Sequence, residues 1–283
     1  MNNFIVRTIT AVFFVAAIVG SFLRPETMVL LFALVTGLTI WEFTGLVNHR
    51  EAVTTNRMIC TVAGVYFFVA MAGYCSELTP SAVFIPYLVT LIYLLVAELY
   101  LKQEDPIHDW AYTMMSQLYI ALPFSLLNAL AFHFSPQGFT TFDPVLPLSV
   151  FVFLWLNDTG AYICGSLLGR HKLFPRISPG KSWEGSIGGG FIVTAAAVGV
   201  WYLTDQYGVN QFQLSALQWA GLGLTVVIFG TWGDLVESLF KRTLGIKDSG
   251  NILPGHGGML DRFDSSLLAI PAATVYIYTL IVI

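Results

Sequence analysis

The chain has 283 residues, of which 56% are hydrophobic and only 11% are charged, with a formal net charge of −4. An average soluble domain carries about 25% charged residues, so this composition excludes an ordinary soluble protein. It indicates an all-α, polytopic integral membrane protein. The net charge says little, because charge in membrane proteins is read loop by loop, and we expect no nucleic-acid partner.

Apolar runs of nearly 20 residues recur along the chain, and each is long enough to cross the bilayer core of roughly 30 Å. Polar breaks that contain proline, such as Arg24-Pro25-Glu26, separate several of them, since proline ends helices. About five spans fall in an N-terminal region, residues 1–145, and the others in a C-terminal catalytic region, residues 146–283. The nine expected spans are 5–23, 27–47, 57–75, 82–101, 110–133, 147–167, 185–204, 215–240 and 264–283.

Basic residues support this count of spans. With nine spans, twelve of the thirteen lysines and arginines fall on one side of the membrane and only Arg24 on the other. Because cytoplasmic loops are enriched in basic residues, this pattern predicts a cytoplasmic N-terminus and a C-terminus outside. The first run also has features of a signal peptide, with Arg7 before it and small residues near Ala17 and Gly20. We favour a retained helix.

Several acidic residues lie within or at the edge of expected spans, where a charge at mid-bilayer costs on the order of 2.5–3.5 kcal/mol. Such residues usually face the protein interior or a water-filled cavity. Glu42 and Glu98 are isolated in the sequence, which favours a charge near a helix end or in a local pair. Asp158, next to Asn157 near the middle of the sixth span, has no such explanation.

The segment "GDLVESLFKR" concentrates charge at the end of the eighth span. On a helix Asp234, Glu237 and Ser238 share one face, and Lys241 and Arg242 follow one turn later. A helix end with ion pairs, such as Glu237 with Lys241, is the simplest interpretation. A functional site is the alternative.

The first of two long polar loops, residues 168–184, contains "SPGKS" directly before a helix. Exposed amides and a helix N-terminus bind phosphate well, so Ser178, Lys181 and Ser182 are candidate phosphate ligands. The glycine spacing is not that of a Walker A loop. The glycines of "GSIGGG" that follow, like Gly160, Gly165 and Gly169 before the loop, more often form a packing face.

The second loop, residues 241–263, leads into "KDSGNILPGHGGMLDRFDS" (247–265). Its glycines permit a tight turn, its basic groups offer donors, and its aspartates offer hard oxygen ligands suited to Mg²⁺. A solvated loop would explain the charge but not the glycines. The sequence therefore predicts a site for a phosphate chain and its metal, with these candidates: Lys247, Asp248, His256, Gly257, Gly258, Asp261, Arg262 and Asp264.

The stretch 238–264, "SLFKRTLGIKDSGNILPGHGGMLDRFD", resembles the signature of the phosphatidate cytidylyltransferase (CDP-diacylglycerol synthase) family, with every fixed position present. "NDTGAYICGSLLGRHK", "SPGKSWEG" and "GDLVES" also look like the family, so the resemblance is strong over residues 155–265. It implies transfer of CMP from CTP to phosphatidic acid, giving CDP-diacylglycerol and pyrophosphate. Further implications are catalysis by Mg²⁺ or Mn²⁺, with room for a second, monovalent cation, and a homodimer with its site facing the cytoplasm. An uncleaved chain with only short loops suggests a bacterial inner membrane, with an organellar membrane as the alternative.

Residue roles follow from the same resemblance. It implies metal ligands at Asp234 and Asp261, which would be catalytic together with Lys241, His256 and Arg262. The substrate-binding residues would be Asn157, Asp158, Ser178, Lys181, Ser182, Ser238, Arg242, Lys247, Asp248, Gly257, Gly258 and Asp264.

Two other readings stay open. A related CTP-dependent lipid transferase or a polyprenol kinase would differ in its acceptor pocket, which the sequence does not reveal. An ion-coupled transporter would use the acidic residues of the spans as an ion path. Against a transporter, no internal repeat is visible, and the polar residues concentrate in two loops rather than at the membrane midplane.

Overall fold

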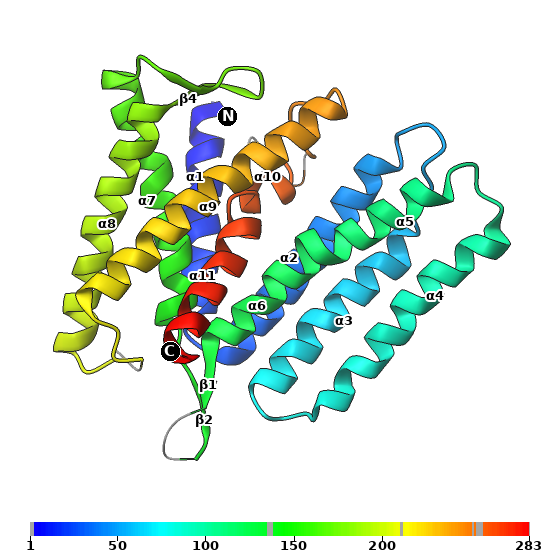
Figure 1. Cartoon of the computed structure of the whole chain (residues 1–283), viewed down its shortest axis with the longest axis horizontal. Coiled ribbons are helices and arrows are strands. Elements are labelled where there is room, and N and C mark those ends of the chain that lie inside the picture. The colour runs from blue at the N-terminus through cyan, green and yellow to red at the C-terminus, as the bar shows by residue number, and fades with distance from the viewer. Residues whose placement is uncertain (1–2, 135–137, 210–211, 251, 253–256, 283) are drawn as a thin grey trace. The chain divides into compact units, whose positions relative to one another are not determined.

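The computed structural model describes residues 3–134, 138–209, 212–250, 252 and 257–282, and for residues 3–7 and 281–282 only the backbone. The chain forms two compact units, both almost wholly helical (Figure 1). The first contains Met1–Pro144 and Thr243–Phe263, and the second contains Val145–Arg242 and Asp264–Ile283. The described residues of the second polar loop, from Thr243 onward, therefore pack with the N-terminal half of the chain.

The predicted all-α membrane fold is confirmed. Within the described residues, eight helical segments are long and apolar enough to cross a membrane, and their ends lie within four residues of the predicted ones. The predicted span 5–23 coincides with helix α1 (Asn3–Ser21), whose part with described side chains, Thr8–Ser21, is shorter. The eight segments are Pro25–Val47, Arg57–Cys75, Ser81–Leu101, Pro106–Ala131, Val145–Leu168, Trp183–Gln206, Ala216–Thr243 and Leu260–Leu280.

The first unit has its core where α2 (Pro25–Val47) and α3 (Arg57–Cys75) meet the fifth span, Pro106–Ala131. Phe124 packs against Phe32 and Phe263, with ring centroids 6.3 and 5.3 Å apart. Phe263 ends the short helix α10, so this aromatic contact fixes the end of the second polar loop in the core of the unit. The helices are α2 (Pro25–Val47), α3 (Arg57–Cys75), η1 (Ser81–Phe84), α4 (Ile85–Leu101), α5 (Pro106–Met115), the π-helical η2 (Ser116–Ala121), α6 (Leu122–Ala131) and α10 (Leu260–Phe263).

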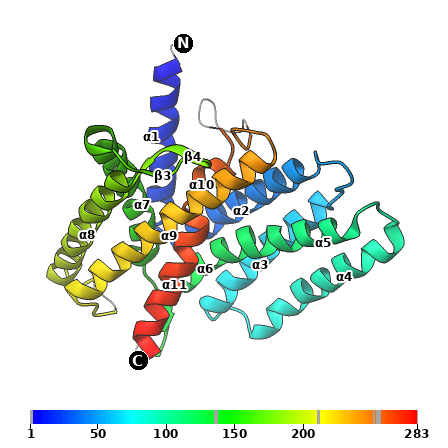
Figure 2. The same cartoon turned by 45° about the horizontal axis from the view of Figure 1, so that its top comes forward.

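The second unit consists of α7 (Val145–Leu168), α8 (Trp183–Gln206), α9 (Ala216–Thr243) and α11 (Ser266–Val282). Helices α7 and α8 lie side by side (Figures 1 and 2). Glycines permit this approach: a Cβ on Gly160 would come within 3.1 Å of the Gly189 Cα, and one on Gly185 within 3.2 Å of the Gly165 Cα. The predicted packing face is therefore confirmed at these glycines.

Replacing Gly189 with alanine is expected to destabilise the second unit by about 1–3 kcal/mol, a typical cost of overpacking. The new Cβ would lie 2.6 Å from the Asn157 Oδ1 and 3.0 Å from the Asn157 carbonyl oxygen. Gly199→Ala on the same helix is the control, since a Cβ there meets nothing within 4 Å. Thermal unfolding in detergent measures both, and equal midpoints would contradict the packing argument.

Two short antiparallel hairpins, which the sequence did not predict, join helices. Strand β1 (Phe132–Phe134) pairs with β2 (Thr140–Phe142), and β3 (Lys172–Phe174) pairs with β4 (Ser178–Ser182). The segment "SPGKS" is thus a strand rather than an open loop, paired with β3 at Ser178 and Ser182. The Glu184 carboxylate of α8 accepts from the backbone amides of Arg170 and His171 and so holds the start of the second hairpin.

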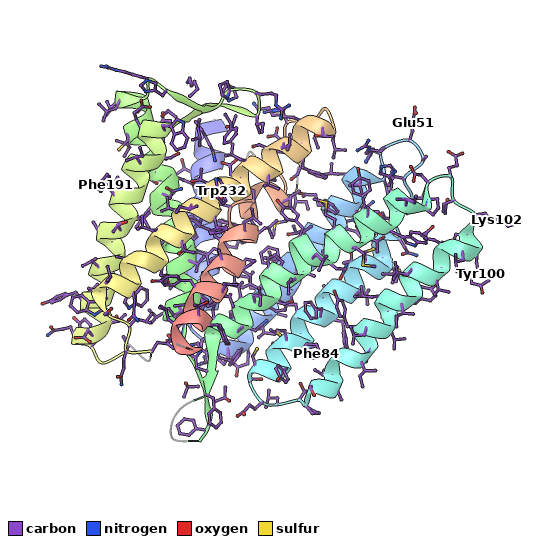
Figure 3. The ribbon with its side chains drawn as sticks, viewed as in Figure 1. Glu51, Phe84, Tyr100, Lys102, Phe191 and Trp232 are labelled. Atoms are coloured by element: carbon purple, nitrogen blue, oxygen red, sulfur yellow. The ribbon has the colours of Figure 1, made fainter. Side chains whose placement is uncertain are left out.

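Large apolar side chains remain exposed on the outer faces of the helices. Phe191 on α8 is 74% exposed and Trp232 on α9 is 52% exposed, and both point away from the helix axes (Figure 3). In the first unit, only 11% of the most apolar 18-residue stretch within Ser81–Leu101 is buried inside the protein. Surfaces of this kind are stable against lipid but not against water, which agrees with membrane-spanning helices.

Candidate functional site

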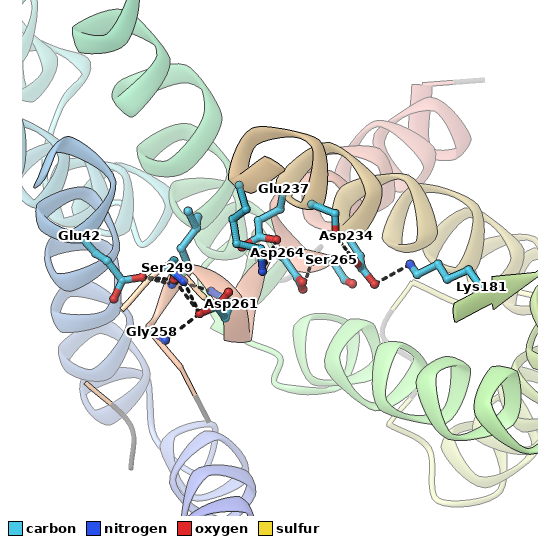
Figure 4. Close-up of polar contacts among 12 residues, drawn as sticks. Glu42, Lys181, Asp234, Glu237, Ser249, Gly258, Asp261, Asp264 and Ser265 are labelled. Carbon is cyan, nitrogen blue, oxygen red and sulfur yellow. Dashed lines mark hydrogen bonds and ion pairs between the residues drawn. The ribbon is translucent and has the colours of Figure 1, made fainter. Parts of the chain in front are cut away.

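The C-terminal half of α9 carries the first polar cluster, in the second unit. Asp234 forms an ion pair with Lys181 of β4, with 2.5 Å between Oδ2 and Nζ, and its Oδ1 accepts from the Ser238 hydroxyl at 3.1 Å (Figure 4). Lys181 and Ser238 are both predicted site residues, and the fold brings them to one aspartate. Asp234 and Lys181 remain about one quarter exposed, so solvent and ligands reach the pair.

One turn further along α9, Glu237 is fully buried and pairs with Lys241, with 2.8 Å between Oε2 and Nζ. This confirms the ion pair that the sequence suggested. The half-buried Asp264 carboxylate lies close enough to Asp234, Asp158 and Lys241 for their charges to act on it. The cluster of the second unit therefore combines several carboxylates with two ammonium groups.

Gly233 permits this arrangement at the start of α11. A Cβ at residue 233 would lie 2.7 Å from the Asp264 carbonyl oxygen and 2.9 Å from that of Ser265. The absence of a side chain at this position lets the backbone that carries Asp264 run directly against α9.

The predicted site residues of α7 and of the β3–β4 hairpin differ in exposure and in their hydrogen bonds. Ser182 is 5% exposed and caps helix α8, since its hydroxyl accepts from the Gly185 amide. Asn157 is 5% exposed, and its Oδ1 has no hydrogen-bond partner and faces Gly189. Asp158 is exposed, and Ser178 is half-buried at the start of β4. For Ser182 the structure thus shows a helix cap, a role that the sequence analysis did not consider.

Asp261 is the centre of the second polar cluster, which lies in the first unit. Its Oδ2 accepts from the Ser249 amide at 2.8 Å, the Ser249 hydroxyl at 2.9 Å and the Gly258 amide at 2.8 Å (Figure 4). Gly257 has φ +79°, a backbone conformation that favours glycine. Ser249 and Gly258, nine residues apart in the sequence, are thus both held at the Asp261 carboxylate.

Glu42 of α2 is part of this cluster, which the sequence analysis missed. It is 8% exposed, and its carboxylate accepts from the Ser249 hydroxyl and from the amides of Met259 and Leu260. The acidic residue within an apolar span was the available signal. Its partners lie more than 200 residues later, however, and no local pattern connects them.

Four further predicted residues, Arg242, Lys247, Asp248 and Arg262, are exposed at the surfaces of their units. His256 lies outside the described residues. The two predicted metal ligands belong to different units, Asp234 to the second and Asp261 to the first. Within the described part of the chain, no group of three or more His, Cys, Asp or Glu side chains is arranged to hold a metal ion.

Comparison with known proteins adds independent evidence. The sequence profile described as "Cytidylyltransferase family" matches residues 5–280. A phosphatidate cytidylyltransferase of Staphylococcus haemolyticus (strain JCSC1435) is 34% identical over 281 residues, covering 95% of this chain and 97% of the relative.

Two further relatives match over part of their length. The phosphatidate cytidylyltransferases of Staphylococcus aureus (strain COL) and Staphylococcus epidermidis (strain ATCC 35984) are 40% and 42% identical over 176 residues. Each of these alignments covers 62% of this chain and 61% of the relative, so the aligned part spans less than two thirds of these proteins. The profile match and the full-length similarity together show that the chain belongs to the cytidylyltransferase family.

Proposed function

We propose that the protein is a phosphatidate cytidylyltransferase, which transfers CMP from CTP to phosphatidic acid and releases pyrophosphate. The observation that carries this proposal is the cluster on α9, where Asp234, its partner Lys181 and the Glu237–Lys241 pair lie within one helical face and its adjacent strand. Carboxylates and ammonium groups in alternation suit a nucleotide triphosphate and its cations. The names of the full-length and partial relatives supply the reaction.

The donor sets fit a divalent cation such as Mg²⁺ or Mn²⁺. In the second unit, Asp234 and Asp264 act electrostatically on each other, and a cation would relieve that repulsion. In the first unit, Asp261 is oriented by three hydrogen bonds. Mg²⁺ in nucleotide sites usually takes one or two carboxylates, and phosphate oxygens and water complete its shell. We therefore propose that Asp234 and Asp261 each supply a metal ligand.

In the proposed reaction an oxygen of the phosphatidate phosphate attacks the α-phosphorus of CTP, a new P–O bond forms, and the bond to pyrophosphate breaks. A bound divalent cation would neutralise phosphate charge and polarise the α-phosphoryl group. Lys181 and Lys241 would hold phosphate oxygens, because Coulomb attraction between ammonium and phosphate is strong in a site partly closed to water. Positioning and charge neutralisation suffice for this displacement, so the mechanism needs no protein nucleophile.

The substrates fit a site at the membrane surface. Phosphatidic acid stays in the bilayer through its acyl chains, while CTP is a polyanion that stays in water. Basic residues at the surface of each unit, such as Lys181 in the second and Lys247 in the first, would attract both anions. We propose that this surface faces the cytoplasm of a bacterial inner membrane and that the protein is a homodimer, which its mass in detergent would test.

The direct test is a release assay. Purified protein in detergent receives phosphatidic acid, Mg²⁺ and radiolabelled CTP, and pyrophosphate and a labelled lipid are measured. We expect both products with CTP, neither with ATP in its place, and neither after EDTA. Product with a polyprenol but not with phosphatidic acid would indicate the related CTP-dependent enzyme instead. No product with either acceptor would refute the proposed reaction and favour the transporter reading.

A cysteine in place of Lys247 tests the proposed orientation. Lys247 is exposed in the loop that follows α9, so a thiol there should react readily with a maleimide. In intact cells a membrane-impermeant maleimide is expected to leave it unlabelled, while permeabilised cells are labelled. Labelling from outside intact cells would reverse the orientation. The native Cys60, Cys75 and Cys164 are first replaced by serine so that only the new thiol reports.

A further inference from the structure

Glu42 is a charged residue on an apolar helix that none of the roles above uses. Its Oε1 accepts from the Leu260 amide at 3.0 Å and from the Ser249 hydroxyl, and its Oε2 accepts from the Met259 amide at 2.9 Å. Both carboxylate oxygens therefore receive a backbone N–H of the segment that precedes Asp261. Hydrogen bonds to a charged acceptor are among the strongest in proteins, so Glu42 ties this segment to α2.

Ser249 connects the two carboxylates of the cluster. Its hydroxyl lies within hydrogen-bond distance of Glu42 and, at 2.9 Å, of the Asp261 Oδ2, while its amide donates to the same Oδ2 at 2.8 Å. Ser249 is 3% exposed, so this connection is protected from water. A displacement of Glu42 would thus be transmitted to Asp261 through one buried side chain.

Two glycines show how close the loop lies to Glu42. A Cβ on Gly250 would lie 2.7 Å from the Glu42 Oε2, and a Cβ on Gly258 would overlap the Glu42 carboxylate. The resemblance implies substrate binding at Gly258. In the structure the group that approaches it is the Glu42 side chain, so the lack of a side chain at Gly250 and Gly258 fits a contact within the protein.

We propose that Glu42 is a positioning residue, which holds Ser249 and Gly258–Leu260 against α2 and thereby orients the Asp261 carboxylate. This inference rests on the proposed function, in which Asp261 supplies a metal ligand. Ligating carboxylates are usually held by neighbours of this kind, whose loss costs about 10–100-fold in metal affinity or activity. Glu42 itself contacts no substrate in this proposal and acts through Ser249 and the loop backbone.

Glu42→Gln is the sharpest variant, because it keeps the shape of the side chain. A glutamine presents one oxygen and one NH₂ group, whereas each Glu42 oxygen faces a backbone N–H. In either orientation the glutamine NH₂ group faces a backbone N–H, that of Met259 or that of Leu260. Two donors cannot form a hydrogen bond, so one of these two hydrogen bonds is lost. Glu98→Gln is the matched control: Glu98 also lies on an apolar helix of the first unit, and its Oε2 has no hydrogen-bond partner.

Two measurements are made on wild type and both variants. Amide hydrogen exchange, followed by mass spectrometry, reports on the peptide that contains Ser249 and Gly258–Leu260. The Mg²⁺ concentration for half-maximal CMP transfer reports on Asp261. We expect Glu42→Gln to accelerate exchange in this peptide, with α3 peptides unchanged, and to raise the Mg²⁺ requirement about tenfold. Glu98→Gln should match wild type in both.

Ser249→Ala extends the test, and it replaces Glu42→Gln in both measurements if that variant does not fold. It removes the hydroxyl link but leaves the backbone donors to Glu42 in place, so the Mg²⁺ requirement should again rise. Since both variants break one chain of contacts, the double variant should be less impaired than the sum of the single effects predicts. Independent, additive effects would overturn the proposed route through Ser249.

Unchanged exchange in Glu42→Gln would overturn the inference, and so would faster exchange with an unaltered Mg²⁺ requirement, which would make Glu42 a structural tie only. A wild-type protein that transfers no CMP would instead refute the proposed function. In that case the exchange data still decide whether Glu42 holds the loop.

Discussion

Replacing Asp261 with asparagine is expected to lower CMP transfer by a factor on the order of 10² to 10³, the usual cost of removing one preorganised charge-stabilising group. The loop should stay folded, because the asparagine oxygen can still accept from the amides of Ser249 and Gly258, which now donate to the Asp261 Oδ2. What the variant loses is the negative charge that a divalent cation requires. Steady-state rates at saturating CTP, measured against Mg²⁺ concentration, check this result.

Asp205→Asn provides the control for this experiment, since it removes an exposed carboxylate near the end of α8. It should transfer CMP at the wild-type rate. The unfolding temperature and elution volume in detergent should be the same for wild type and both variants. Wild-type activity in Asp261→Asn would sink the assignment of Asp261 as a metal ligand, whereas an unfolded variant would show that the carboxylate charge holds the loop together.

Gly258→Ala is the second large expected effect, and it acts by displacement rather than by loss of a ligand. The added methyl group would overlap the Glu42 carboxylate, so the loop must move away from α2 or Glu42 must leave its three donors. Overpacking of this kind costs about 1–3 kcal/mol. Because the Gly258 amide also donates to Asp261, we expect CMP transfer to fall by about 10–100-fold.

Gly20→Ala is the comparison for this variant, because a Cβ at Gly20 on α1 meets nothing within 4 Å. Thermal unfolding and CMP transfer should both remain at or slightly above the wild-type values for Gly20→Ala, since alanine favours a helix over glycine. Gly258→Ala with normal activity would mean that the loop tolerates displacement, and the close approach to Glu42 would then be irrelevant to catalysis.

The membrane-spanning helices could be predicted well because their signal is local. A run such as 57–75 is predominantly apolar after Arg57 and is flanked by polar residues, so hydropathy alone locates the helix Arg57–Cys75. The i, i+4 pair Glu237–Lys241 was also predictable, since both partners lie on one turn of one helix. The glycines of α7 and α8 belong to the same class, because their spacing marks a face before the partner is known.

Contacts between distant segments were not predictable in this way. The Lys181–Asp234 pair joins a strand to a helix more than 50 residues later, and the sequence identified both residues without indicating that they meet. Ser182 is predicted as a phosphate ligand, and the structure adds a cap on helix α8. An N-cap serine and an anion-binding serine occupy the same position before a helix, so the sequence does not distinguish the two roles. For Glu42 the sequence favoured a charge near a helix end or in a local pair, because its partners come from the opposite end of the chain and no local pattern indicates them.

The distance in sequence between Glu42 and Ser249, 207 residues, has a consequence for biogenesis. At a synthesis rate of about 5–20 residues per second, α2 enters the membrane roughly 10–40 s before its hydrogen-bond donors exist. During that interval Glu42 has none of its native partners. Its position five residues before the end of α2 puts it about 7.5 Å from the helix terminus, near enough for the carboxylate to reach interfacial water. Insertion of α2 thus does not have to wait for the rest of the protein, whereas burial of Glu42 becomes one of the last steps of folding.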